Sequence, residues 1–339
     1  MDILQRNFSC LPPNAFLARV QAFLGAVFLA GIGTVSLAQS TVEPPPAWAY
    51  PVNPPGFKPP PDDGTIRRVP GSNVGYTLTQ VSDRFVSPDW HPADNPTRPE
   101  IVARGRKPEV FACGFCHRAD GPGGPENANL TGLPAAYIVQ QMMDFKSGAR
   151  RGSVLERGPM QTKALVIKSV NESELQAAAE YFSSIKPRSI VRVVEVSIVP
   201  KTYITGSHFA KVNTGETEPI GQRIIEVPDD LEQFISRDSH ARFTVYVPPG
   251  SIKKGQALAA DGGNGKTVQC GICHGPALKG LGPIPGIAGR SPSYIVRQLY
   301  DFKHGTRAGT GSVLMKPAVE KLTVEDMLNL AAYAASLEP

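Results

Sequence analysis

The pentapeptide CGFCH at residues 113–117 decides how this sequence folds, because a second copy, CGICH, stands at residues 270–274. The same shift of 157 residues carries YIVQQMMDFKSGAR at 137–150 onto YIVRQLYDFKHGTR at 294–307 without a gap. An internal repeat of this kind indicates a duplicated structural unit. The sequence therefore predicts two homologous domains, one around each pentapeptide.

Each copy continues to a further helix that has its own start signal. Asn171 and Thr323 are each followed three residues later by an acidic residue, which is the pattern of a side-chain N-cap with a capping box. The runs that follow, LQAAAEY at 175–181 and MLNLAAY at 327–333, favour amphipathic helix. We therefore expect each unit to be a small helical domain.

The rest of the chain divides by composition. Proline is frequent in residues 39–95, where it forbids helix and favours extended backbone, so we expect an extended arm. Residues 189–249 contain β-branched runs bounded by proline and glycine, which predict strands. The expected fold is mainly α: an N-terminal segment at 1–38, the proline-rich arm, a helical domain at 96–188, a small β-rich insert, and a second helical domain at 250–339.

Residues 1–38 have the features of a secretory signal. Arg6 and Arg19 precede or border an apolar run that ends in small residues at Ala38, where we place cleavage. This pattern predicts export to the periplasm. The alternative is an uncleaved membrane anchor, because the 19 residues that end at Ala38 can just span a bilayer.

Composition excludes one class of partner. The length of 339 residues suggests two or three domains, and the hydrophobic content of 41% is ordinary for globular cores. The formal net charge is only +5, and no basic cluster with interleaved aromatic residues is present. The sequence therefore predicts no binding of nucleic acid.

Four of the five cysteines lie in the two CxxC pairs, and the fifth, Cys10, lies in the leader. Such pairs suit a covalent haem, a zinc ion or a redox-active disulfide. Closed zinc sites need four protein ligands near each pair, but the chain has only six histidines. A thioredoxin-like pair needs alternating strands and helices around it, and this pattern is missing.

His117 and His274 directly follow the second cysteine of each pair, which is the attachment signature of haem c. We therefore predict two haem c groups, one in each helical domain, with His117 and His274 as the proximal ligands of the iron atoms. The predicted thioether bonds come from the four paired cysteines, Cys113, Cys116, Cys270 and Cys273.

A methionine thioether is a frequent ligand on the far face of such a haem in electron carriers. Met160 and Met315 are the candidates, because each lies between the two helices of its unit, whereas the other methionines of the repeats fall within predicted helices. Arg150 and Arg307 occupy equivalent positions and are candidate contacts of the haem propionates. The alternative role of these arginines is to complement the helix dipole at its C-terminal end.

These motifs together resemble the diheme class I c-type cytochromes of bacterial periplasms, in which two similar domains each carry one haem. The resemblance covers residues of about 96–187 and 250–339, and it is most specific in the second unit, where LTVEDMLNLAAYAASL follows the methionine. In such cytochromes a loop carbonyl resembling that of Pro285 accepts the ring NH of the proximal histidine. The first unit departs from this pattern, because Ala128 stands there.

The expected function is electron transfer without substrate chemistry, between redox partner proteins that the sequence does not name. A diheme c-type peroxidase is one alternative, and it requires an accessible distal face with acid and base groups beside it. An electron-transfer subunit of a periplasmic or membrane dehydrogenase is the other. That reading predicts association with a membrane respiratory complex or dehydrogenase, with the arm and the β-rich insert as docking surfaces.

Overall fold

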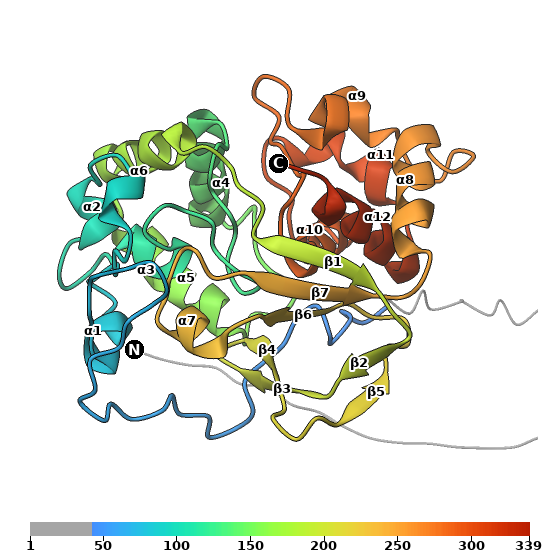
Figure 1. Cartoon of the computed structure of the whole chain (residues 1–339). Helices are drawn as coiled ribbons and strands as arrows, with labels where there is room; N and C mark the ends of the chain where they lie inside the picture. Colours follow the sequence, from blue (N-terminus) through green and yellow to red (C-terminus); the bar gives the residue numbers. More distant parts are fainter. Residues whose placement is uncertain (1–42) are drawn as a thin grey trace, which may run out of the picture. The chain divides into compact units, whose positions relative to one another are not determined.

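The computed structural model describes residues 43–339, and Pro44–Pro339 form one compact unit (Figure 1). The predicted signal segment at 1–38 lies outside the described residues. Among the helices that the structure describes, none combines the length and the apolar character that a membrane crossing requires.

The first repeat forms five helices. They are α2 (Glu100–Ala103), α3 (Cys113–His117), α4 (Ala135–Ser147), α5 (Gly158–Ser169) and α6 (Glu172–Ser184). The Asn171 side chain accepts a hydrogen bond from the backbone of Glu174, whose carboxylate accepts from the Asn171 backbone in return, so the predicted capping box starts α6. Val102, Ile138 and Phe182 belong to the hydrophobic core of this repeat.

The second repeat forms a matching group. Its helices are α8 (Ser251–Asp261), α9 (Cys270–His274), α10 (Pro292–Lys303), α11 (Lys316–Val319) and α12 (Val324–Ser336), with short 3-10 turns η2 (Pro276–Leu278) and η3 (Ser312–Leu314). Thr323 starts α12 with the predicted capping box. Helix α5 is therefore much longer than α11, the helix that precedes the capped helix in the second repeat.

The strands that the structure describes all lie between Val191 and Val247, within the interval where the sequence predicts a β-rich insert. They are β1 (Val191–Glu195), β2 (Ile198–Pro200), β3 (Thr202–Thr205), β4 (His208–Lys211), β5 (Thr217–Pro219), β6 (Ile225–Pro228) and β7 (Phe243–Val247). Strand β7 is the centre of a three-stranded sheet, parallel to β1 and antiparallel to β6, while β2 pairs with β5 and β3 with β4.

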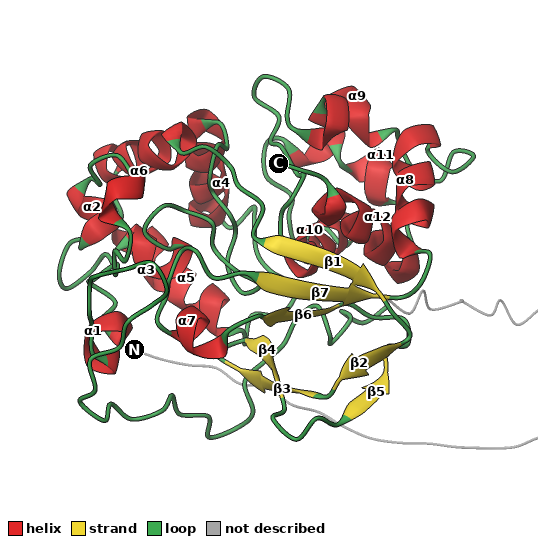
Figure 2. Ribbon diagram, viewed as in Figure 1, coloured by secondary structure: helices red, strands yellow, loops and turns green. Residues whose placement is uncertain are grey.

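The three-stranded sheet is part of the core of the second repeat. Phe243 and Val245 of β7 lie in the same buried hydrophobic cluster as Val296 of α10 and Leu328 of α12. Figure 2 shows the strands gathered in one region, with the helices of the second repeat above them and α3 and α5 of the first repeat to their left in this view. The insert is therefore a packed structural element rather than a loose linker.

The segment before the first repeat follows the surface mostly as irregular chain, with helix α1 (Leu78–Ser82), the 3-10 turn η1 (Pro92–Asp94) and a short antiparallel bridge between Arg67 and Tyr76. Helix α1 forms in a stretch without proline, where a capping box between Thr77 and Gln80 starts it. Two aromatic side chains attach this segment to the rest of the fold. Tyr50 donates from its hydroxyl to Asp301 of α10 (2.8 Å), and the indole of Trp90 donates to the carbonyl oxygen of Ser236 (2.8 Å).

Candidate functional site

Both pentapeptides form one-turn helices that hold their histidines in the same way. The ring Nδ1 of His117 lies 2.8 Å from the carbonyl oxygen of Ala128, and that of His274 lies 2.8 Å from the carbonyl oxygen of Pro285. A histidine that donates from Nδ1 keeps Nε2 as a lone-pair donor for a metal. The replacement of Pro285 by Ala128 in the first unit leaves this bond intact, because the acceptor belongs to the backbone.

The protonation states of the histidines and cysteines follow from their burial. Burial lowers the pKa of His117 to about 4 and also lowers the pKa of His274, so both rings are neutral at pH 7. Burial raises the pKa of Cys113 to about 12 and raises that of Cys270 as well. Redox-active CxxC pairs need a thiolate of low pKa. The surroundings here suit metal-ligating histidines and disfavour a thioredoxin-like pair.

One cavity of about 460 Å³ connects the two pentapeptide sites. His117 and His274 both border it, and its lining is mostly apolar, with side chains from α4 and α10. A flat, largely apolar group attached at each pentapeptide fits such a space, since the histidines face it from both repeats. The residues present therefore fit two haem groups.

The two predicted propionate contacts, Arg150 and Arg307, meet across the boundary between the repeats. Their backbones form an antiparallel bridge, and each side chain is only 6% exposed. Arg150 donates to the hydroxyl of Tyr294 (3.0 Å), and Arg307 donates to the hydroxyl of Tyr137 (2.8 Å). Each arginine thus reaches into the other repeat through the equivalent tyrosine.

The same two guanidinium groups share two glutamines. Gln141 accepts from Arg150 and Arg307 (both 2.7 Å), and Gln298 accepts from the same pair at 2.8 and 3.0 Å. These side-chain acceptors are neutral, and both arginines border the 460 Å³ cavity. Two buried cations with neutral partners favour an anionic group beside them, as haem carboxylates are.

The structure separates the two predicted distal methionines. Met315 borders the same cavity as His274, so these two predicted ligands face one space. Met160 lies on α5 and borders a second cavity of about 40 Å³ instead. The residue of α5 that borders the larger cavity together with His117 is Lys163, whose pKa is lowered to about 7 by burial and the charge of Arg150.

The sequence interpretation did not single out Lys163. The signal was present, because Lys163 and Met315 each stand eight residues before the N-cap of the last helix of their repeat. Counting forward from the cysteines obscures this equivalence, since the first repeat is longer in the intervening segment.

The two pentapeptide helices differ sharply in their exposure. Phe115 in α3 is 7% exposed, whereas the equivalent Ile272 in α9 is 62% exposed. A Cβ atom added to Gly114 would collide with the Ser87 side chain, whereas one added to the equivalent Gly271 would meet nothing within 4 Å. Segments outside the repeat therefore cover α3 and leave α9 open.

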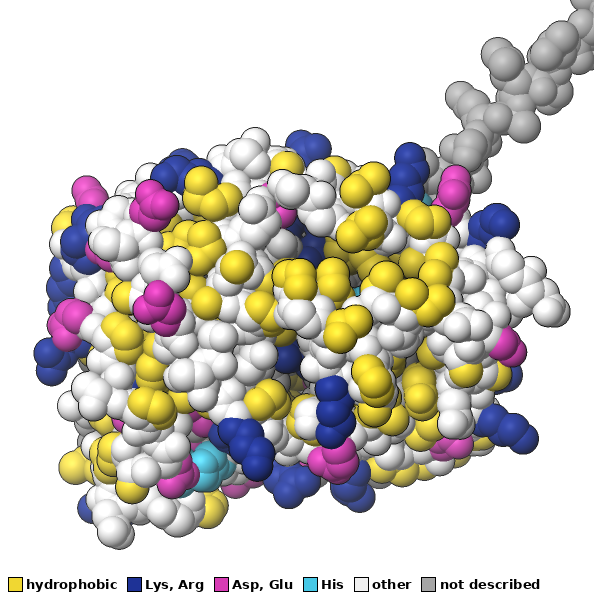
Figure 3. Space-filling model, turned by 90° about the horizontal axis from the view of Figure 1, so that it is seen from above, with side chains coloured by type: hydrophobic (Ala, Val, Ile, Leu, Met, Phe, Trp, Pro, Cys, Tyr) yellow, Lys and Arg dark blue, Asp and Glu magenta, His cyan; other side chains and the backbone are white. Residues whose placement is uncertain are grey.

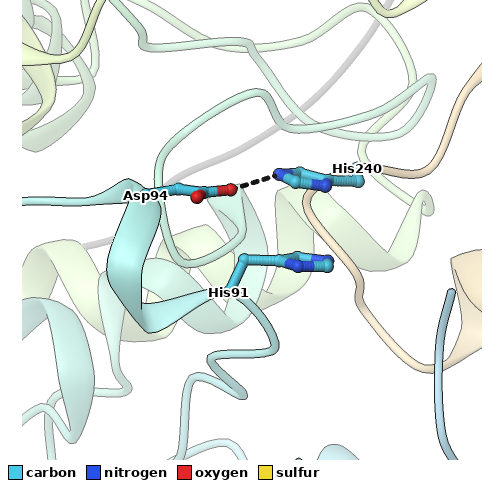
Figure 4. Close-up of side chains that lie close together, drawn as sticks. All are labelled: His91, Asp94 and His240. Atoms are coloured by element: carbon cyan, nitrogen blue, oxygen red, sulfur yellow. Dashed lines mark ion pairs between the residues drawn. The ribbon is translucent and has the colours of Figure 1, made fainter. Parts of the chain in front are cut away.

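A group outside this site, His91, Asp94 and His240, is drawn in Figure 4. The two imidazole rings stack at 3.7 Å between centroids, and they are nearly parallel, with 7° between their planes. The Nε2 of His240 pairs with Asp94 (3.0 Å), and that of His91 pairs with Asp238 (3.0 Å). A histidine nitrogen binds a metal ion in the plane of its ring, so two stacked, parallel rings cannot both bind one ion. We therefore interpret the group as a contact between the N-terminal segment, which contains His91 and Asp94, and the β-rich insert, which contains His240.

No family model matches the chain, but individual relatives align with about two thirds of it. It is 25% identical over 232 residues to the thiosulfate dehydrogenase electron acceptor of Thiomonas intermedia, which covers 68% of this chain and 80% of the relative. It is 24% identical over 234 residues to cytochrome c4 of Azotobacter vinelandii, which covers 68% of this chain and 86% of the relative.

A single-domain relative gives a higher identity. The cytochrome c-554(548) of Halomonas halodenitrificans is 36% identical over 80 residues, which are 23% of this chain and 96% of the relative. Nearly the whole of that cytochrome therefore has a counterpart in one part of this chain.

Proposed function

Because this chain belongs to the diheme class I c-type cytochromes, which carry two covalently bound haem c groups, we propose that it transfers single electrons in the periplasm and exchanges them with partner proteins at the surface around α9. Each haem, when bound, supplies an iron atom that changes its oxidation state by one electron. The protein supplies the ligands, the burial and an accessible surface. The exposure of Ile272, against the burial of Phe115, is the observation that carries the proposal.

The roles of the ligating residues follow from their shared cavity. We assign the iron-ligating nitrogens to His117 and His274, whose Nδ1 atoms are already held by backbone carbonyls. Met315 closes the second site, since it borders the cavity together with His274. The thioether attachments fall to the cysteines of the two pentapeptides, Cys113, Cys116, Cys270 and Cys273.

Arg150 and Arg307 then act as charge partners of the propionates. Their shared hydrogen bonds to tyrosines and glutamines of both repeats hold the two guanidinium groups at the boundary, where carboxylates from either site can reach them. Such buried positive charge favours the reduced state of a nearby iron, because reduction lowers the positive charge there.

The proposed docking surface surrounds α9. Three apolar residues of the second repeat that do not line the 460 Å³ cavity, Ile272, Leu281 and Val313, are each more than half exposed. Leu314 borders that cavity next to Val313, so the patch lies beside the site itself. Figure 3 views the molecule from above relative to Figure 1, and it shows hydrophobic side chains gathered on the half that holds α9. Exposed apolar patches of this kind mark interaction surfaces, and the occupant we propose is a redox protein.

The electron donor that we propose is a periplasmic dehydrogenase. A relative that matches 68% of this chain bears the name thiosulfate dehydrogenase electron acceptor, and this supports a dehydrogenase as the class of donor. In that arrangement the chain itself binds no small-molecule substrate. Met315, which borders the cavity of His274, would fill the distal position of the second site, and this supports an electron carrier rather than a peroxidase with an accessible distal face.

The test uses the haem-loaded protein with thiosulfate dehydrogenase and thiosulfate as the electron source. Ile272→Glu places a charge in the patch, and we expect the reduction rate to fall about tenfold, the size typical of a central contact residue. Leu155→Glu is the matched control, since Leu155 is also exposed but lies in the first repeat. A slower rate in Leu155→Glu with an unchanged rate in Ile272→Glu contradicts the proposed surface.

A further inference from the structure

We propose that Lys163, and not Met160, is the distal ligand of the iron held by His117, so that the two haem sites of this chain have different ligand sets. The inference deepens the proposed function and rests on it, because it requires haem attachment at the first pentapeptide. Lys163 follows Met160 by about one helical turn on α5.

The position of Lys163 relative to the last helix is the first observation. Capping boxes at Asn171 and Thr323 fix the start of α6 and α12 in the same way. Counted back from these caps, Met315 stands eight residues before Thr323, and Lys163 stands eight residues before Asn171. Met160 stands eleven residues before its cap. The residue equivalent to Met315 is therefore Lys163.

The extra length of the first repeat supports this alignment. Both repeats contain GSVL, at 152–155 and 311–314. Sixteen residues lead from Leu155 to Asn171, but nine lead from Leu314 to Thr323. The seven additional residues precede Lys163, extend α5 at its N-terminal end and include Met160. Met160 thus belongs to a segment that the second repeat lacks.

The cavity gives the second observation. Lys163 borders the 460 Å³ space that His117 also borders, and Met315 borders the same space with His274. The Lys163 ammonium lies 4.1 Å from the centre of the Phe145 ring, which lines this space too. Met160 is not part of that lining. Its thioether instead lies beside Gly152, where an added Cβ would be 3.2 Å from the sulfur.

An amine ligand changes the redox behaviour of the first site. Thioether ligation by methionine raises the reduction potential of a haem relative to nitrogen ligation. The first site is therefore expected to have the lower potential of the two. The open surface around α9 then belongs to the site of higher potential.

The experiment follows the methionine-to-iron charge-transfer band in the oxidised, haem-loaded protein. In the unmodified protein, which carries two haems, we expect the band to have the intensity of a single methionine-ligated haem. Met160→Ala leaves that intensity unchanged, Met315→Ala abolishes it, and Lys163→Met doubles it and raises the potential of the first haem. Lys168→Ala, an exposed lysine of the same helix, is the control and changes nothing.

Three results separate the possible failures. Two covalent haems per chain, with a band that Met160→Ala halves, overturn Lys163 as the ligand and leave the proposed function standing. Fewer than two covalent haems by mass spectrometry contradict the proposed function itself. If Lys163→Ala does not expose the first iron to added imidazole, the inference is wrong even where the methionine band is unaffected.

Discussion

The guanidinium of Arg237 lies 3.7 Å from the centre of the Phe115 ring and also donates to the Phe115 carbonyl oxygen (2.9 Å). A further bond from Arg237 to the carbonyl oxygen of Val81 (2.9 Å) ties helix α1 to the same point. Ile272, the equivalent of Phe115, has no such cover and is 62% exposed. Two copies of one motif thus receive different surroundings from segments that are not repeated.

This cover predicts different responses to the same substitution. Gly114→Ala forces a methyl group against Ser87, so we expect the free energy of unfolding to fall by about 1–3 kcal/mol. Gly271→Ala is the matched control, and because its methyl group meets open space we expect a change within about 0.5 kcal/mol. Denaturant unfolding of both haem-loaded variants measures the difference. If both variants lose the same free energy of unfolding, α3 is not covered more closely than α9.

Tyr50 is predicted to hold the N-terminal segment on α10. Tyr50→Phe removes the bond to Asp301 and leaves a buried carboxylate with one donor fewer, so we expect a loss of about 1–3 kcal/mol in the free energy of unfolding. Ser153 continues to donate to that carboxylate, which limits the effect. Faster hydrogen exchange in residues 44–60 is the second expected result. Tyr203→Phe, at an exposed position, serves as the control.

The arginine pair is predicted to raise the reduction potentials of the haems. Arg150→Gln or Arg307→Gln removes one buried positive charge, and because that charge favours the reduced iron, we expect the potentials to fall. Potentiometric titration measures the change. Arg104→Gln, at a surface arginine that pairs with Glu100, is expected to leave the potentials unchanged. Higher reduction potentials in Arg150→Gln or Arg307→Gln would contradict this prediction.

The same pair makes a coupling prediction. Arg150 donates to Tyr294, so Arg150→Gln and Tyr294→Phe are expected to be non-additive by about 0.5–3 kcal/mol in the free energy of unfolding. The equivalent cycle of Arg307 and Tyr137 is expected to give a coupling of similar size, because the contact is reciprocal. Additive losses in both cycles contradict a contact between the repeats.

Stability is predicted to fall on acidification. The folded pKa of His208, which lies outside both haem sites, is lowered by burial, while an unfolded histidine titrates near about 6.5. The unfolded chain therefore takes up a proton first, and the stabilisation from neutral His208 is lost as the pH falls from about 6.5 toward the lower pKa of the folded ring. Unfolding curves at several pH values measure this slope. Constant stability over the range contradicts the neutral, buried ring.

The local parts of this protein were predictable because they depend on neighbours in the chain. The capping boxes at Asn171 and Thr323 need only residues three positions apart, and both form. The motif and the repeat were also enough to predict a diheme class I c-type cytochrome with two haem c groups, and the relatives confirm this family. The roles of Met160, Met315 and the two arginines stay predictions.

The sequence by itself determined the two repeats, the helices that start at their caps, and the cysteine and histidine spacing at each site. Only the tertiary structure decided that α3 is covered while α9 is open, that Arg150 and Arg307 meet, and that Lys163 rather than Met160 borders the cavity of His117. The physical reason is the distance along the chain over which each kind of interaction acts. Caps and ligand spacing are set within one or two helical turns, whereas burial and charge neighbours depend on segments that lie more than a hundred residues apart, such as Phe115 and Arg237.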